Sequence, residues 1–129
     1  LLSDCKAHTQ LPQPLITPIS MLPEEVKESL SSKNTLDFGL KIESGLFEFG
    51  PYFCSLPASL VIAYAFAITT SGGATRLLMA GFDGYGADDP RSLEMQSLLS
   101  LYQSNSEALP LVAVTPNRYS LPTHSIYAL

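Results

Sequence analysis

The second half of the chain alternates short apolar segments with helical repeats, and this alternation constrains the fold more than any other feature. Residues 76–80 and 110–114 form apolar runs, the pattern of strands covered on both faces. Apolar side chains recur at helical spacing over residues 90–104, and an alanine-rich helical stretch at residues 56–70 precedes the first strand. Such alternation predicts right-handed parallel βαβ units. The expected fold class is α/β, a three-layer Rossmann-like domain with a mostly parallel sheet and helices on both faces.

The first half of the chain predicts shorter elements. Residues 14–20 have the β-branched content of a short strand, and Pro23 followed by two glutamates is typical of a helix start. Residues 36–43 alternate apolar and polar side chains, which predicts a half-buried strand. The aromatic segment at residues 47–53 is marked by Gly and Pro, and we expect a loop over the core. No linker divides these elements, so residues 1–129 are predicted to be one domain.

Charge and cysteine content argue against several classes of protein. The net charge of −5, with only 7 Lys and Arg, argues against a nucleic-acid partner. The charge-free stretch 50–75 has a continuous apolar part of only residues 60–68, too short for a membrane span. Cys5 and Cys54 lack the spacing of a zinc site or a disulfide framework, so we expect buried, reduced thiols and a cytoplasmic location.

Low charge also bears on the context of the chain. Only 15% of residues are charged, below the roughly 25% of soluble proteins, so we expect much of the chain to be covered, by its own core or by further sequence. The same composition suggests a homodimer. The first residue is Leu1 rather than an initiator methionine, and we expect a carboxyl-terminal part of a longer protein.

The candidate binding residues follow the two predicted buried strands. Ligands of an open parallel sheet bind outside the carboxyl ends of its strands. Asp83 and Tyr85 come after the first of these strands and Asn117 after the second, so we expect these residues to lie near one another. A helix starting at residues 55–59 would aim its N–H groups at the same edge, where they could bind an anion or a carbonyl group.

Other features of the same turn have a structural explanation. Asp89 followed by Pro90 is typical of an N-cap and a first helical residue, and Asp88 suits the helix dipole. The glycines fit neither the dinucleotide fingerprint nor a Walker motif (Gly81, Gly84 and Gly86). The aspartates lack a histidine or the alternating spacing that would favour a divalent cation. No catalytic residue and no metal site is therefore predicted in this chain.

Residues 55–122 resemble the bacterial lipooligosaccharide sialyltransferases, through ASLVIAYAFAITTSGGA, AGFDGY and LVAVTPNRYSLP. In that family the matching segments bind the cytidine nucleotide of the donor sugar, and the tyrosine of the turn meets its phosphate. The resemblance implies a ligand edge lined by six residues: Ser59, Gly81, Asp83, Gly84, Tyr85 and Asn117. The family's general base is a histidine between this turn and the last strand, and residues 86–114 contain none.

Nearly the whole chain is similar to the carboxyl-terminal region of bacterial proteins of the 4-hydroxy-2-oxovalerate aldolase type, through LDFGLKIESGLFEFG, AGFDGYGADDPR and SIYAL. The amino-terminal half of those proteins is a pyruvate-aldolase barrel of the HMG-CoA lyase type, associated with surface polysaccharide synthesis. This resemblance implies that the lyase chemistry and its divalent metal belong to an upstream barrel. No cofactor is then expected in this chain.

Three functions are consistent with these observations. The leading hypothesis is a domain that binds a nucleotide, sugar or acyl-sugar for an aldolase-type enzyme of surface polysaccharide biosynthesis. The second is half of a sialyltransferase-like glycosyltransferase, which would need upstream strands and a base for activity. The third is a structural domain that docks an aldolase barrel or a second copy through an exposed apolar face.

Overall fold

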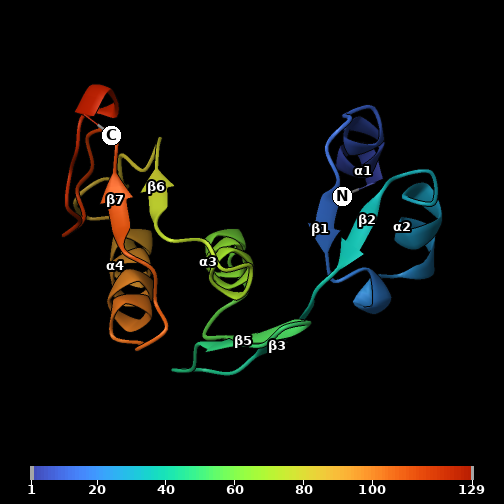
Figure 1. Cartoon of the computed structure of the whole chain (residues 1–129), viewed down its shortest axis with the longest axis horizontal. Helices are drawn as coiled ribbons and strands as arrows, with labels where there is room; N and C mark the ends of the chain where they lie inside the picture. The colour runs from blue at the N-terminus through green and yellow to red at the C-terminus, as the bar shows by residue number, and fades with distance from the viewer. Residues whose placement is uncertain (1, 129) are drawn as a thin grey trace.

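The computed structural model describes residues 2–128 as short helices and strands around two apolar cores (Figure 1). The helices are α1 (Leu2–Thr9), α2 (Glu24–Ser29), α3 (Val61–Ser71) and α4 (Pro90–Gln103), with 3-10 turns η1 (Ile19–Met21) and η2 (Ile126–Ala128). The strands are β1 (Leu15–Thr17), β2 (Thr35–Asp37), β3 (Gly39–Ile42), β4 (Glu48–Phe49), β5 (Phe53–Leu56), β6 (Leu77–Met79) and β7 (Leu111–Ala113).

The strands form three small, separate sheets. β1 and β2 pair in parallel, with Leu15 opposite Thr35. In the second sheet β5 is central, between parallel β3 and antiparallel β4. β6 and β7 form the third sheet, in parallel, with Leu78 opposite Val112. An isolated bridge to Thr123 adds a segment after β7 to the other edge of that strand.

The predicted three-layer Rossmann-like domain with a mostly parallel sheet and helices on both faces is wrong. No extended parallel sheet forms within residues 2–128, because both edges of β5 already have partners and β6 pairs only with β7. The segment at residues 47–53, expected to be a loop, contributes the antiparallel partner: β4 pairs with β5, with Phe49 opposite Cys54. The predicted strand at residues 36–43 divides at Phe38 between the first and second sheets.

The larger core packs α3 and α4 against the second and third sheets. Tyr102 of α4 lies at its centre with no exposed surface. Its ring centroid is 4.6 Å from that of Phe66 and 5.5 Å from that of Phe47, so aromatic contacts join α3, α4 and the segment before β4. The other buried members are Phe38, Cys54, Leu56, Ala63, Ala67, Met79, Leu98, Leu99, Leu111, Ala113 and Leu121.

A smaller core lies in the first third of the chain. Cys5 of α1 packs with Val26 and Leu30 in and after α2, and Leu15 of β1 covers them. In Figure 1 these blue and cyan elements lie at the opposite end of the molecule from α4, β6 and β7, and β3 and β5 lie between the two ends. The predicted burial of both cysteines is confirmed.

Helix α4 begins where the sequence predicts it. Asp89 is the N-cap: its carboxylate accepts a hydrogen bond from the Arg91 amide (2.9 Å), and Pro90 follows as the first helical residue. The helix start predicted at residues 55–59 is wrong, because Ser55 is a buried residue of β5 whose hydroxyl donates to Glu48 (2.9 Å). α3 therefore starts only at Val61.

Across residues 2–128, no helix combines the length and hydropathy that a bilayer crossing requires. The uncharged helix α3 has 11 residues, whereas a membrane span needs roughly 20.

The reactivity of Cys54 tests the packing of the larger core. Burial raises the pKa of its thiol to about 11, and its side chain has no exposed surface. We expect Cys54 in the Cys5→Ala variant to resist iodoacetamide at mildly alkaline pH and to react quickly in denaturant, because alkylation needs an accessible thiolate. Mass spectrometry of the alkylated protein measures both rates. Equal rates in buffer and in denaturant would contradict the packing of β5 described above.

Candidate functional site

The turns that follow β6 and β7 meet at one edge of the third sheet, and the predicted parallel pairing of these strands is confirmed. Two hydrogen bonds join the turns. The Gly81 amide donates to the Thr115 hydroxyl (2.9 Å), and the Arg118 guanidinium donates to the Tyr85 carbonyl (3.3 Å). Side chains separated by more than thirty residues in the sequence therefore face a common space.

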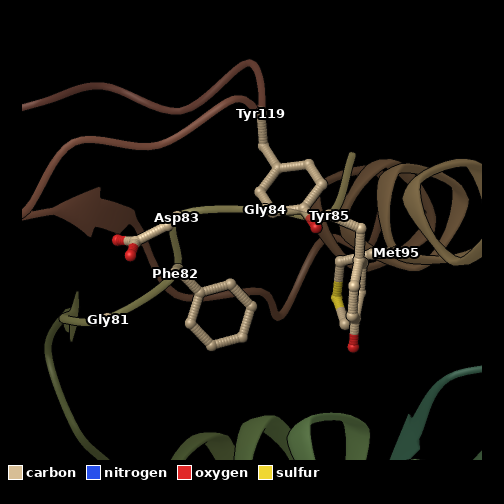
Figure 2. A pocket seen from close by; sticks show the side chains of 7 residues that line it. All are labelled: Gly81, Phe82, Asp83, Gly84, Tyr85, Met95 and Tyr119. Carbon is tan, nitrogen blue, oxygen red and sulfur yellow. The ribbon is translucent and has the colours of Figure 1, made fainter. Parts of the chain in front are cut away.

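This space is a pocket of about 350 Å³ (Figure 2). Figure 2 shows the rings of Phe82 and Tyr85 and the side chain of Met95 on its sides, with Tyr119 above them. The centroids of the Phe82 and Tyr119 rings are 6.4 Å apart. The complete lining is Gly81, Phe82, Asp83, Gly84, Tyr85, Met95 and Tyr119. The turn after β6, helix α4 and the segment after β7 each contribute to it.

Two glycines give the turn after β6 its shape. Gly81 has φ of +72° and Gly84 has φ of +98°, in the left-handed region that favours glycine. A Cβ atom on Gly84 would also lie 3.1 Å from the Cβ atom of Arg118. Glycine at residue 84 therefore allows the two turns to approach closely and places Arg118 beside Tyr85.

Two of the six predicted site residues lie outside this pocket. Asn117 accepts a hydrogen bond from the Tyr119 amide (2.9 Å) and donates one to the Thr123 hydroxyl (3.3 Å), so it shapes the turn that presents Tyr119. Ser59 lines a different pocket, beside β3 and the start of α3. The other four line the pocket: Gly81, Asp83, Gly84 and Tyr85.

Two arginines lie beside Tyr85 and differ in their partners. The guanidinium carbon of Arg91 is 4.3 Å from the centroid of the Tyr85 ring, and Arg91 also forms an ion pair with Asp89. Hydrogen bonds from Arg91 lower the pKa of Asp89 to about 2, so this pair is neutral overall at pH 7. Arg118 is exposed and forms no ion pair with any residue from 2 to 128. Its positive charge is therefore available to an anionic ligand.

The pocket contains little that could perform catalysis. Asp83 is the only carboxylate in its lining, and Figure 2 shows its oxygens directed away from Tyr85 and Met95. Burial raises the pKa of the Tyr119 hydroxyl, which therefore stays protonated at pH 7 and can donate a hydrogen bond. Within residues 2–128, no group of three His, Cys, Asp or Glu side chains could hold a metal ion. The side chains at this site can stack on a planar ring, form hydrogen bonds and attract an anion.

Sequence reasoning did not single out three residues at this site: Phe82, Met95 and Arg118. Phe82 and Met95 fit ordinary strand and helix patterns, so no local signal separates them from core residues. Arg118 follows Asn117, and the close approach of the two turns is what brings its guanidinium to the Tyr85 carbonyl, beside the pocket.

Comparison of the chain with protein-family models, with curated proteins and with solved structures finds no match.

Proposed function

We propose that the chain binds a nucleotide in the aromatic pocket, with the base between the rings of Phe82, Tyr85 and Tyr119 and the phosphate at Arg118. The observation that supports this best is an aromatic pocket of about 350 Å³ beside Arg118, which forms no ion pair with any residue from 2 to 128. Aromatic side chains stack on the flat face of any base, and a guanidinium binds phosphate oxygens through directed hydrogen bonds. The volume is within the range of small-molecule sites.

The proposed role is binding rather than catalysis. A transfer reaction needs a positioned base or nucleophile, and the pocket offers only a carboxylate that points away from its interior. A nucleotide-sugar would fit the same proposal, with the sugar continuing beyond the phosphate. If the resemblance to aldolase-type proteins of surface polysaccharide biosynthesis holds, the proposal gains a partner, an upstream barrel that would act on the bound ligand.

Titration with CMP and with cytidine tests the position of the phosphate. The Arg118→Ala variant should bind CMP about fivefold more weakly than the wild type, as expected for one exposed charge pair, and should bind cytidine unchanged. Isothermal titration calorimetry measures the four dissociation constants. Arg76→Ala is the matched control, because Arg76 is also exposed but directly precedes β6, at the opposite end of that strand from the turn that lines the pocket. An equal loss for both ligands, or no binding of either by the wild type, would contradict the proposal.

A further inference from the structure

The dipeptide Asp83–Gly84 lies in the turn after β6 and lines the aromatic pocket. Both residues are exposed, and Figure 2 shows the Asp83 carboxylate directed away from the side chains of Tyr85 and Met95. The carboxylate forms no hydrogen bond or ion pair with any residue from 2 to 128, and the Gly84 amide donates to none of them. The carboxyl group and the amide nitrogen that follows it are therefore both free to react with each other.

Glycine at residue 84 favours such a reaction. A glycine has no Cβ atom to shield its nitrogen from the preceding side chain, and its backbone adopts a wide range of conformations. Residues 82–86 belong to no helix or strand, so no ladder of hydrogen bonds fixes the dihedral angles of the turn. The hydrogen bonds that join this turn to the turn after β7 are at Gly81 and Tyr85, on either side of the dipeptide. The dipeptide between them can rotate until the nitrogen faces the carboxyl carbon.

The other four aspartates lack at least one of these conditions. Asp4 lies in α1 and Asp37 in β2, and regular backbone geometry holds the next amide in place. The amide that follows Asp88 donates to the Gly86 carbonyl (3.0 Å). The residue after Asp89 is a proline, which has no N–H. Among the aspartates of residues 2–128, the conditions are therefore met only in the turn after β6.

We propose that Asp83–Gly84 is a site of spontaneous isomerisation to isoaspartate, which separates the two turns of the pocket. The Gly84 nitrogen forms a bond to the Asp83 Cγ atom, and the carboxyl hydroxyl leaves with the amide proton as water, which closes a succinimide ring. Water then opens the ring at either of its carbonyl groups. Cleavage at Cγ restores aspartate. Cleavage at the backbone carbonyl leaves the chain running through Cγ, with an additional methylene group in the backbone and a free α-carboxylate.

The additional methylene group would lie where the two turns approach closely. A Cβ atom on Gly84 would be only 3.1 Å from the Cβ atom of Arg118, so this part of the turn has little space to shift towards Arg118. The hydrogen bond from Arg118 to the Tyr85 carbonyl is 3.3 Å long, at the upper end of the range for such bonds. A longer backbone directly before Tyr85 therefore breaks this bond and displaces the Tyr85 ring.

Peptide mapping of the full chain, incubated for weeks in neutral buffer, tests the chemistry. Isoaspartyl and aspartyl peptides have the same mass and differ in chromatographic retention, which also separates isomerisation from deamidation. We expect isoaspartate to accumulate at residue 83 and not at Asp37. The wild type unfolded in urea should isomerise at residue 83 at a similar rate, because the folded turn already leaves both reacting groups free.

Asp83→Glu is the matched variant, because it keeps the charge but would have to close a larger ring, which forms far more slowly. It should show no isomer at residue 83 after the same incubation. Isoaspartate at residue 83 no more abundant than at Asp37, or accumulation about tenfold slower in the folded chain than in urea, would overturn the inference.

Hydrogen exchange of the incubated chains tests the separation of the turns. The Gly81 amide, which donates to the Thr115 hydroxyl (2.9 Å), should exchange faster in isomerised chains than in fresh protein. Unchanged exchange at Gly81 in isomerised chains would overturn that part of the inference. Isomerised chains should also bind CMP more weakly, an expectation that rests on the function proposed above. A fresh wild type that binds no CMP would contradict the proposed function alone, since peptide mapping and hydrogen exchange need no ligand.

Discussion

Replacing Tyr102 with alanine is expected to lower the free energy of unfolding by about 4 kcal/mol, the cost of removing a buried aromatic side chain. The ring has no exposed surface, and its centroid is within 6 Å of those of Phe47, Phe49 and Phe66. No nearby residue can fill the resulting cavity without losing its own contacts, because protein interiors are close-packed. For a chain of this size the melting temperature should fall by roughly 15 °C.

The hydroxyl of Tyr102 makes a separate contribution to the free energy of unfolding. The Thr70 hydroxyl donates to the Phe66 carbonyl (2.6 Å), so the Tyr102 hydroxyl donates to Thr70 (2.8 Å) and accepts from the Leu109 amide (3.0 Å). Tyr102→Phe keeps the ring but leaves the Leu109 amide without this acceptor, and should cost about 1–2 kcal/mol.

Urea unfolding curves of the wild type and three variants separate these contributions. Tyr127→Ala is the control, because Tyr127 is 94% exposed and its loss should change stability by less than about 0.5 kcal/mol. A Tyr102→Ala protein within about 1 kcal/mol of the wild type would show that Tyr102 is not at the centre of a packed core.

The helices and strands whose signals are local were largely predictable from the sequence. Helix α4 has a capping aspartate, a proline and apolar side chains at helical spacing, and the structure starts it at Pro90. β6 and β7 lie inside the predicted apolar segments and pair in parallel as expected. In each case the residues that determine the element lie within it or directly beside it.

The arrangement of the sheets was not predictable in the same way. Whether β6 pairs with β5 depends on which strands already occupy the edges of β5, and two other segments decide that. The aromatic residues of β4 and its neighbourhood read as a loop, since Gly50 and Pro51 interrupt their alternation. Pairing between distant segments leaves little trace in local spacing, so the smaller sheets were missed.

The same distinction between local signals and contacts of distant segments applies to the candidate site. The turn with Asp83 and Tyr85 was located from the end of its strand, and parallel pairing brings it to the turn after β7. Ser59 was placed at the site through a helix start that the structure moves to Val61, because β5 takes the preceding residues. The position of Arg118 beside Tyr85 could not be predicted from the sequence, because it depends on the close approach of the two turns.

The second large effect is expected in the hairpin formed by β4 and β5. Gly50→Ala should lower the free energy of unfolding by about 2 kcal/mol. The Gly50 amide donates to the Phe53 carbonyl (2.9 Å), closing the turn between β4 and β5. A Cβ atom on residue 50 would lie 2.7 Å from that carbonyl oxygen, which is backbone and cannot rotate away. The methyl group must therefore push β4 from β5, and the edge of β5 that β4 occupies would lose its antiparallel partner.

Hydrogen exchange and urea unfolding of Gly50→Ala measure this effect. Amides at residues 48–55 should exchange faster than in the wild type, while those of β6 and β7 keep their protection, because the third sheet shares no strand with the hairpin. Gly86→Ala is the matched control: a Cβ atom there meets nothing within 4 Å, so its stability should change by less than about 0.5 kcal/mol. Unchanged exchange at residues 48–55 in Gly50→Ala would contradict the close approach of residue 50 to the Phe53 carbonyl in this hairpin.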